Sequence, residues 1–406
     1  MDHPFVRAVE KALGWDGPGA LGTTFARGAL DEPEFLGKLL SPNKLLDLVM
    51  RRSLTTPQFR IFHEGAELHS GRYINPAVTR RGQAIPMADM RRVGSLLNSG
   101  CTLVLDEIDF FDPVMEVVCR ALQWWSHELV QVNAYLTTQE ASGFKLHWDD
   151  HDVLIVQLAG EKSWEVRGAS RSVPMYRDSA PNIEPSEEIV WQGTMKAGDV
   201  MHIPRGFWHQ ATRRDQGDGY SLHATFGIVK RAGVNWAAWL ADQCRTDEAF
   251  RRDLDRWNPD QWDRQQEALV QTVGRIAAEL PPAEFLAARE RERSSARHVP
   301  FIGSFGKPDA VVCVSEFEPT LRDCSGVVEV IASGKKLTFA AKAAPALRLL
   351  LSGHPVNIAA AAADTGVDVE HLAEILIEEE LCTALTPELS LGYTELSTAA
   401  GSSKAR

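Results

Sequence analysis

Two short segments carry the residues of this chain that are best suited to metal chemistry. His147-Trp148-Asp149 places an imidazole and a carboxylate two residues apart, and His209 follows 62 residues after His147. Residues two apart on a strand point to the same face, so a histidine from another strand can complete one triangular face of a metal's coordination shell. Two histidines and one carboxylate suit ferrous iron and leave the other positions open. The pattern predicts a non-haem iron oxygenase centre.

The residues around these ligands predict a barrel that would hold them. Residues 153–158 form a β-branched, apolar run typical of a buried strand, and Ala159-Gly160-Glu161 predicts a turn into a second strand at 162–166. Residues 195–199 predict a turn into a short strand at 200–204, and Arg205-Gly206 predicts a bend before His209. This succession is typical of a small double-stranded β-barrel, with ligands on its strands and turns at its mouth.

At these segments the chain resembles a known family. Residues 147–150 (His-Trp-Asp-Asp), residues 156–164 and residues 198–210 are similar to the motifs of the JmjC-type ribosomal oxygenases, also called the cupin-4 family, and residues 133–138 match the strand before their metal site. The motifs span about residues 20–230, and the order of later segments extends the resemblance to about residue 395. The resemblance implies an enzyme that uses Fe(II) as cofactor and 2-oxoglutarate as cosubstrate. His147, Asp149 and His209 fall on its iron ligands.

The resemblance also assigns the cosubstrate contacts. Lys162, 15 residues past His147, falls on the basic residue that holds the distal carboxylate of 2-oxoglutarate. Physical chemistry agrees, because a carboxylate buried in a narrow barrel without a cation costs free energy. Asn133, Tyr135 and Thr225 are further polar contacts that the resemblance implies. No catalytic residue beyond the metal centre is expected.

Three of these interpretations have alternatives. His151 lies two residues beyond Asp149, so on a continuous strand it would face the same side and compete as a ligand. The resemblance places the ligands at 147 and 149 instead, which leaves His151 near the mouth of the barrel. His202 and His223 are expected to be packed strand histidines, and Lys162, taken alone, fits an exposed turn equally well.

Composition sets the wider limits. With 406 residues, 44% apolar and 24% charged, the chain is expected to be a soluble globular protein of two or three domains. Its six cysteines contain no CxxC pair, which favours free thiols in a reducing compartment. No segment resembles a signal peptide or a membrane span, so we expect cytoplasmic localisation and no membrane partner. The net charge of −12 argues against nucleic acid and is compatible with a basic protein or peptide partner.

The later segments predict two further units. We expect an α+β chain with a JmjC/cupin catalytic domain at 1–230, a helical region at 231–298, a winged-helix-like domain at 299–395 and a disordered tail at 396–406. Trp236, Trp239 and Leu240 fit one face of a helix, and the resemblance implies that this region forms a homodimer. The would-be recognition helix of the winged-helix-like domain, residues 368–380, carries Asp and Glu but no Lys or Arg. It would be repelled by phosphates, which favours a protein-contact or structural role.

Together these observations predict hydroxylation of a protein or peptide side chain, and the resemblance points to a ribosomal protein. N-demethylation follows the same chemistry and remains an alternative reaction. A small metabolite or a biosynthetic peptide remains an alternative substrate. A non-oxygenase cupin metalloenzyme, such as an isomerase or a zinc hydrolase, could use the same ligands but would not need Lys162. A non-catalytic protein on a degenerate barrel is the remaining class.

Overall fold

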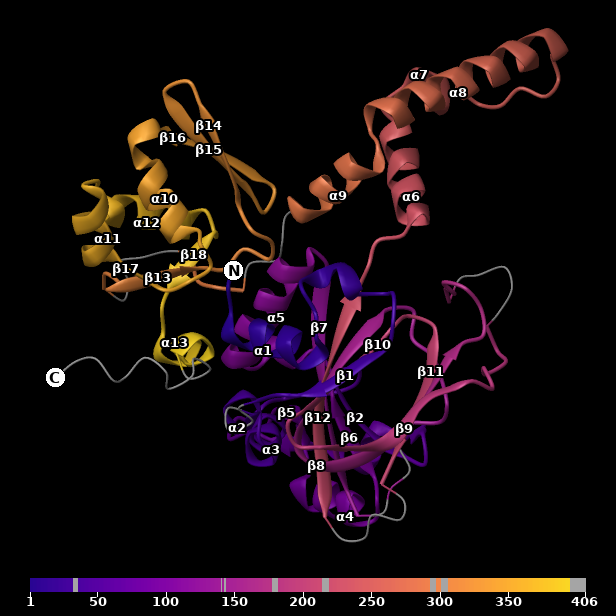
Figure 1. Cartoon of the computed structure of the whole chain (residues 1–406), viewed down its shortest axis with the longest axis vertical. Coiled ribbons are helices and arrows are strands. Elements are labelled where there is room, and N and C mark those ends of the chain that lie inside the picture. The colour runs from indigo at the N-terminus through magenta and orange to yellow at the C-terminus, as the bar shows by residue number, and fades with distance from the viewer. Residues whose placement is uncertain are drawn as a thin grey trace.

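The computed structural model describes residues 1–31, 36–139, 141, 144–176, 182–213, 219–292, 297–300 and 306–394. Figure 1 shows a β-rich body formed by the first 230 residues, an arm of helices that projects from it, and a C-terminal lobe beside the arm. The predicted disordered tail, 396–406, lies outside the described residues. The division of the chain into domains, with its boundaries, remains a prediction.

The body is built from two sheets that share one strand. The larger sheet runs in the order β1-β10-β8-β12-β7-β6-β2-β3, and off this path β9 and β11 pair with β8. Its strands are β1 (Ala26–Ala29), β2 (Phe59–His63), β3 (Ala66–Glu67), β6 (Thr102–Leu105), β7 (Leu129–Thr138), β8 (Asp152–Ala169), β10 (Asp199–Ile203) and β12 (Tyr220–Val229). The smaller sheet joins β9 (Ile189–Lys196) and β11 (Phe207–Thr212) to the second half of β8. The two sheets face each other, as a cupin barrel requires.

The predicted turn at 159–161 is wrong. β8 is continuous from Asp152 to Ala169, pairing with β12 up to Gly160 and with β9 from Glu161 onward. Gly160 has a φ of +63°, and a Cβ at this position would lie 1.8 Å from the carbonyl oxygen of Tyr220. The glycine therefore allows the strand to pass from one sheet to the other without a break.

Helices cover the outer face of the larger sheet. The helices of the body are α1 (Pro4–Leu13), α2 (Leu36–Leu39), α3 (Pro42–Arg51), α4 (Met90–Asn98) and α5 (Pro113–Ser126), and a hairpin of β4 (Ile74–Val78) and β5 (Ala84–Ala88) lies beside them. Helix α5 begins where the Asp112 side chain accepts the N–H of Met115, with a proline in its first turn. Apolar side chains from α1, α3 and α5 pack with those of β7, β8 and β12 in the main core.

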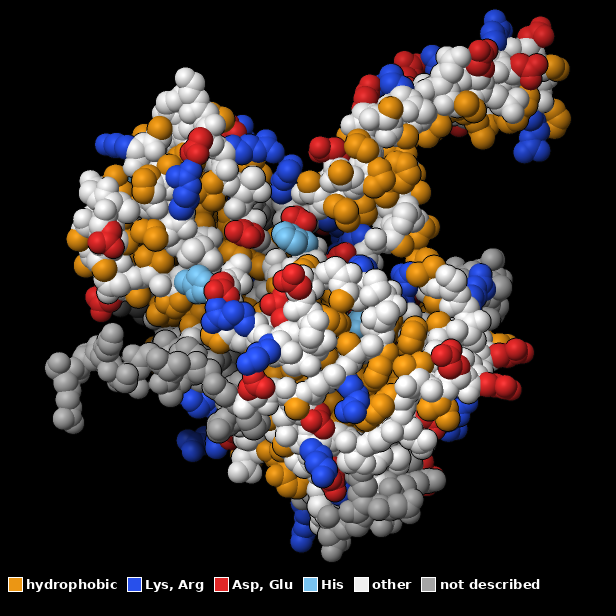
Figure 2. Space-filling view, in the orientation of Figure 1, with side chains coloured by type: hydrophobic (Ala, Val, Ile, Leu, Met, Phe, Trp, Pro, Cys, Tyr) orange, Lys and Arg blue, Asp and Glu red, His pale blue; other side chains and the backbone are white. Residues whose placement is uncertain are grey.

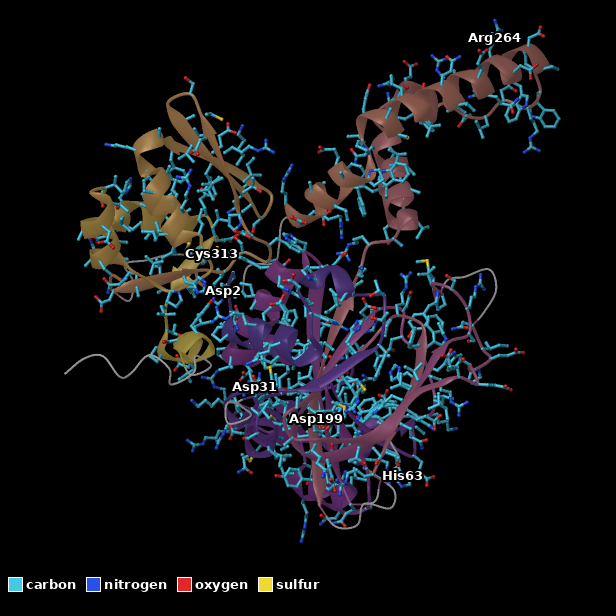
Figure 3. All side chains as sticks on the ribbon, in the orientation of Figure 1. Asp2, Asp31, His63, Asp199, Arg264 and Cys313 are labelled. Atoms are coloured by element: carbon cyan, nitrogen blue, oxygen red, sulfur yellow. The ribbon has the colours of Figure 1, made fainter. Side chains whose placement is uncertain are left out.

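The arm consists of helices α6 (Gly233–Cys244), α7 (Glu248–Arg251), α8 (Pro259–Glu279) and α9 (Pro282–Glu290). The buried apolar residues within it are few: Leu240, Cys244, Ile276 and Phe285. Trp257 is 87% exposed, and Val270 is 69% exposed. Figure 2 shows hydrophobic side chains along one side of the arm, and Arg264 marks its outer part in Figure 3.

The C-terminal lobe has its own core. Its elements are β13 (Ala310–Cys313), β14 (Thr320–Cys324), β15 (Val327–Ala332), β16 (Lys335–Ala340), α10 (Ala344–Leu350), β17 (Val356–Asn357), α11 (Ile358–Thr365), α12 (Val369–Glu378), β18 (Cys382–Ala384) and α13 (Pro387–Thr394). The two successive helices α11 and α12 are separated by Gly366 at a φ of +68°, and α12 lies within the helix predicted at 368–380. The winged-helix assignment itself remains a prediction.

Side chains of helix α5 form hydrogen bonds that hold this lobe against the body. The indole N–H of Trp124 donates to the Ser315 carbonyl at 3.0 Å, and the Gln123 amide donates to the Glu316 carbonyl at 2.8 Å. At the N-terminus, the His3 ring contacts the Gly392 carbonyl at 3.0 Å. These buried polar contacts fix the lobe against the body, close to the labelled Asp2 and Cys313 of Figure 3.

The six cysteines are all free thiols, five of them buried and Cys324 exposed, as the absence of a CxxC pair predicted. In the part of the chain that the structure describes, no helix combines the length and the apolar character needed to cross a membrane.

Gly160 provides a test of this fold. Gly160→Ala places a methyl group on the Tyr220 carbonyl and an L side chain at positive φ, so we expect a loss of at least about 3 kcal/mol in the free energy of unfolding. Gly82→Ala is the matched control, because Gly82 also has positive φ (+75°) but nothing lies within 4 Å of its Cβ position. The control substitution Gly82→Ala should lower the free energy of unfolding by about 1 kcal/mol. Urea denaturation followed by fluorescence measures both, and equal losses would contradict the steric role of Gly160.

Candidate metal centre

The two histidines of the predicted triad are held side by side by their backbones. The His147 N–H donates to the His209 carbonyl at 3.1 Å, and the His209 N–H donates to the His147 carbonyl at 2.7 Å. His147 is therefore joined to β11 by an isolated bridge, within the connection that precedes β8. The expectation that His147 and Asp149 share a regular strand is wrong, since this one reciprocal pair of hydrogen bonds places the segment.

The three side chains converge. One ligand atom from each of His147, Asp149 and His209 lies within 4.8 Å of the others, and Nε2 of His209 is 3.4 Å from Oδ2 of Asp149. Nδ1 of His147 is 2.8 Å from the Lys145 carbonyl, and Nδ1 of His209 is 3.2 Å from the Phe207 carbonyl. Each ring then carries its proton on Nδ1, which leaves the Nε2 lone pair available to a metal.

Electrostatics in this cluster favour a charged Asp149 carboxylate and a neutral His147 imidazole. Burial alone would raise the pKa of Asp149, but the adjacent imidazoles of His209 and His147 hold it well below its usual range. Burial lowers the pKa of His147, and the neighbouring His209 lowers it further. A deprotonated carboxylate and neutral imidazoles are the forms that bind a metal ion.

Tyr176 supports Asp149 from outside the cluster. Its hydroxyl lies 3.2 Å from the Trp148 carbonyl and 3.5 Å from Oδ1 of Asp149, and its ring lies 4.8 Å from that of Trp148. The Tyr176 N–H also donates to Oδ2 of Asp150 at 3.3 Å. The sequence analysis missed this residue, because Tyr176 belongs to the irregular connection between β8 and β9 and carries no motif.

A cavity of about 270 Å³ opens beside the triad between the two sheets. All of the predicted site residues line it, with polar and aromatic neighbours on every wall. Its lining residues are Arg60, Gln131, Asn133, Tyr135, Phe144, His147, Asp149, His151, Val153, Ile155, Lys162, Trp164, His209, Ala211, His223, Thr225 and Gly227.

Lys162 is an interior residue. Its side chain is 2% exposed, and its Nζ donates to Oγ1 of Thr137 at 3.2 Å. Burial, together with the positive charge of Arg213, lowers the pKa of Lys162 to about 7. The alternative of an exposed turn residue is therefore wrong. A buried ammonium group with a strongly lowered pKa, facing a cavity, is typical of a site for an anion.

The other predicted contacts lie on β7 and β12, two of the strands that line the cavity. Asn133 and Thr225 are cross-strand partners on β7 and β12, and Oδ1 of Asn133 accepts the Glu107 N–H at 3.0 Å. Tyr135 stacks on His223 with a ring distance of 4.8 Å, and burial raises the pKa of the Tyr135 hydroxyl. The structure thus brings all three into the cavity, and their roles remain predictions.

The remaining histidines separate into two kinds. His202 is fully buried, and its Nδ1 is 3.0 Å from the Thr24 carbonyl, as expected for a packed strand histidine. His223 is also buried but lines the cavity. His151 lines the cavity as well, yet it does not belong to the group of side chains that converge on a possible metal position.

Metal titration can distinguish Asp149, a predicted metal ligand, from His151, which lines the cavity outside the triad. Asp149→Asn should weaken Co(II) binding at least about 100-fold, because it removes the charged ligand. His151→Ala should change the Co(II) dissociation constant less than about threefold, since His151 lies outside the triad. Visible absorption of the bound Co(II) reports both. Equal losses in the two variants would restore His151 as a ligand.

Comparisons with known proteins agree with this geometry. Residues 109–232 match a JmjC domain model. Ribosomal oxygenase 1 of Rattus norvegicus is 33% identical over 208 residues, which cover 48% of this chain and 34% of that protein. The bifunctional lysine-specific demethylase and histidyl-hydroxylase NO66 of Drosophila yakuba is 28% identical over 204 residues, covering 49% of this chain and 28% of that protein. The chain thus matches about a third of the length of these relatives.

Solved structures extend the likeness in fold. The X-ray structure of ycfD from Escherichia coli has a TM-score of 0.56 at 13% identity, covering 90% of this chain and 96% of that one. A structure of YcfD, a ribosomal oxygenase, in complex with cobalt and 2-oxoglutarate has a TM-score of 0.53 at 13% identity and covers 89% and 95% of the two chains. The protein therefore carries a JmjC domain on a cupin fold, and its resemblance to the ribosomal oxygenases is confirmed over about half of its length.

Proposed function

We propose that this protein is an Fe(II)- and 2-oxoglutarate-dependent oxygenase that hydroxylates a side chain of a protein or peptide, with a ribosomal protein as the first candidate. The observation that carries the proposal is the convergence of His147, Asp149 and His209 in one cavity with the buried cation of Lys162. The names of the relatives and the cobalt and 2-oxoglutarate bound to YcfD support it.

The donor set fits a ferrous ion. Two imidazoles with Nδ1 directed at backbone carbonyls and one carboxylate supply nitrogen and oxygen ligands on a single face. A ferrous ion held by these three residues would keep coordination positions open for the keto acid and oxygen. Zinc in hydrolases uses similar ligands, but such an enzyme has no need of a buried ammonium group at the far end of the cavity.

The cavity also fits 2-oxoglutarate. Lys162 Nζ would pair with the distal carboxylate, next to the hydroxyl of Thr137. Nε1 of Trp164 and Nδ1 of His223 line the same region, are buried, and have no hydrogen-bond partner within the described parts of the chain. Buried polar atoms without partners are rare in folded proteins, and here they face the space that a bound keto acid would occupy.

The chain's own residues would do three things in the reaction. When bound, iron and 2-oxoglutarate supply the oxidising power that turns a C–H bond into C–OH. Lys162 would neutralise the carboxylate and fix the cosubstrate's orientation, while Tyr176 would hold Asp149 through its outer oxygen. Trp164, Ile155 and Val153 form apolar wall around the centre, which excludes water from the reacting atoms.

The remaining expectations form part of the same proposal. The winged-helix-like lobe would act as a protein contact rather than a nucleic-acid reader, since Glu370 and Glu379 of its acidic helix already pair with Lys307 and Lys335. A cytoplasmic location is consistent with the free cysteines. The exposed apolar side of the arm would pack against a second copy of the chain in a homodimer.

The first test is an anaerobic titration of metal-free protein with Fe(II) and then 2-oxoglutarate. Chelation of the keto acid should produce a visible charge-transfer band, which His147→Ala abolishes. Succinate release in air would then confirm turnover, and mass spectrometry of treated ribosomal proteins would locate the hydroxyl group. A protein that binds Fe(II) but never gives the band would belong to another cupin metal chemistry.

Lys162 predicts a pH dependence. Because the pKa of Lys162 is lowered to about 7 in the free protein, the ammonium form dominates below that pH and the neutral amine above it. The carboxylate of 2-oxoglutarate binds the ammonium form, so its dissociation constant should rise up to about tenfold per pH unit above about pH 7. Calorimetry at about pH 8 in two buffers should show proton uptake on binding.

Lys162→Met removes the charge at similar volume and should weaken 2-oxoglutarate binding about 100-fold and abolish the proton uptake. Lys196→Met, on the exposed side of β9, is the matched control and should change neither. Affinity that is independent of pH in the wild type would contradict the role of Lys162.

The exposed apolar residues of the arm predict that the protein forms a dimer. Val270 and Val273 lie one turn apart on α8 and are 69% and 37% exposed, so the pair should be covered in a dimer. The double substitution Val270→Asp with Val273→Asp should convert a dimer to a monomer in analytical ultracentrifugation, because it buries two unpaired charges. Gln271→Asp on the same helix should leave the mass unchanged. A monomeric wild type would refute the dimer.

A further inference from the structure

The hairpin of β4 and β5 is exposed over its outer half and ends in two arginines. The Gly82 N–H donates to the Thr79 carbonyl at 2.9 Å, so Arg80 and Arg81 occupy the two corners of a β-turn. Gly82 has a φ of +75°, which lets the second strand begin directly after the turn. Of residues 76–86, all except Thr79 are exposed. The turn therefore holds both arginines at the outer end of the hairpin.

Three more arginines lie at the other end of the hairpin. Arg72 ends the short helix η3 (Ser70–Arg72) before β4, and Arg91 and Arg92 lie in the first turn of α4, which follows β5. The Arg92 guanidinium donates to the Gly71 carbonyl at 3.2 Å, which brings the start of α4 next to Arg72. The two groups of arginines are separated by the length of β4, roughly 17 Å at the rise of a β-strand.

The net charge of −12 does not describe this segment. Residues 69–98 contain five arginines, no lysine and one acidic residue, Asp89. Asp89 already pairs with Arg92 at 3.3 Å and accepts the Asn75 amide at 2.8 Å. The side chains of the other four arginines have no hydrogen bond or ion pair with any residue that the structure describes. Arginine is the side chain whose fork of donors best matches a phosphate group, so the segment is suited to phosphates.

The edges of the hairpin argue against a peptide strand as its partner. Pro76 and Pro86 are paired across the two strands, and neither has an N–H to donate. The Pro86 carbonyl accepts the Ser53 hydroxyl at 2.7 Å, so the outer edge of β5 already contacts the segment after α3 (Figure 1). The outer edge of β4 lacks a donor at its midpoint, where an added strand needs one.

The hairpin begins next to a strand of the cavity. Tyr73, directly before β4, donates its hydroxyl to the Phe59 carbonyl of β2 at 3.5 Å, and the two rings lie 5.1 Å apart. Arg60, the next residue of β2, lines the cavity. A partner bound along the hairpin would therefore lie beside a strand that borders the metal centre.

We propose that this hairpin, with the arginines at its two ends, is a docking surface for RNA, which the guanidinium groups would bind through the phosphate backbone. The choice of RNA rests on the proposed function, since ribosomal proteins are bound to RNA. The acidic chain as a whole would attract a basic substrate protein, whereas the hairpin would repel that protein and attract the phosphates that accompany it. Val78 and Ile85, 73% and 41% exposed beside the turn, would contact sugars and bases.

The experiment measures binding of a fluorescein-labelled RNA hairpin to the whole chain by fluorescence anisotropy, at about 50 to 200 mM KCl. The double substitution Arg80→Gln with Arg81→Gln should weaken binding at least about tenfold at the lower salt, because two phosphate contacts are lost. It should also make the slope of log Kd against log[KCl] shallower by about two. Arg72→Gln with Arg91→Gln should weaken binding at least about fivefold from the other end.

The matched control is Arg256→Gln with Arg322→Gln, which removes two exposed arginines from the arm and the C-terminal lobe. This control should change Kd less than about twofold, since the net charge changes equally but the hairpin is intact. Thermal unfolding of each variant should match the wild type, because all of the substituted side chains are exposed.

Four results would overturn the docking surface. They are no RNA binding by the wild type, an equal loss of binding in the control, no loss in either hairpin variant, and tighter binding of another probe than of RNA. The other probes are a DNA hairpin of the same sequence, poly-glutamate, and phosphatidylserine vesicles. Calorimetry with Fe(II) and 2-oxoglutarate on the same samples separates the two proposals. RNA binding without 2-oxoglutarate binding would support the docking surface and refute the proposed function, and the reverse result would do the opposite.

Discussion

The reciprocal hydrogen bonds between the backbones of His147 and His209 are the constraint on which this site depends. They join a connecting segment to β11, bring two imidazoles to a ring distance of 4.4 Å, and place Asp149 close to the second one. Each ring is then oriented by a carbonyl two residues earlier in its own segment. Because backbone N–H and carbonyl groups position and orient the two imidazoles, few other side chains are needed to hold the metal-binding residues in place.

The second constraint is the strand that crosses between the sheets. β8 carries Ile155 on its first half and Lys162 and Trp164 on its second, so one continuous strand contributes to both sheets that enclose the cavity. The crossing depends on Gly160, where a side chain would collide with the Tyr220 carbonyl. Without it, Lys162 would not reach the interior, where burial and Arg213 lower its pKa and prepare it for an anion.

The sequence predicted the cupin class and singled out His147, Asp149, His209 and Lys162, because these residues lie in short motifs that resemble those of a known family. The structure places the four side chains around one cavity, and their roles remain predictions. Prediction from the sequence failed where conformation depends on distant contacts. Ala159-Gly160-Glu161 has the composition of a turn, and only the carbonyl of Tyr220, 60 residues on, shows why a glycine is needed inside a strand. Tyr176 and the packing of His151 against Gly227 were likewise invisible, since each joins segments far apart in sequence with no motif of its own.

Helix α5 links the cavity to the rest of the chain, because its side chains contact both β7 and the C-terminal lobe. Sγ of Cys119 lies 3.7 Å from the Val130 carbonyl of β7, next to the Gln131 that lines the cavity, and Oε1 of Gln123, one helical turn on, accepts the Val130 N–H at 3.0 Å. The Gln123 amide and the Trp124 indole donate to carbonyls of the C-terminal lobe, and Arg120 donates to the hydroxyl of Tyr393 at 3.3 Å. Buried donors of this kind cost free energy if their partners leave. The lobe is therefore part of the scaffold that holds β7, and its attachment and the shape of the cavity are supported by the same helix.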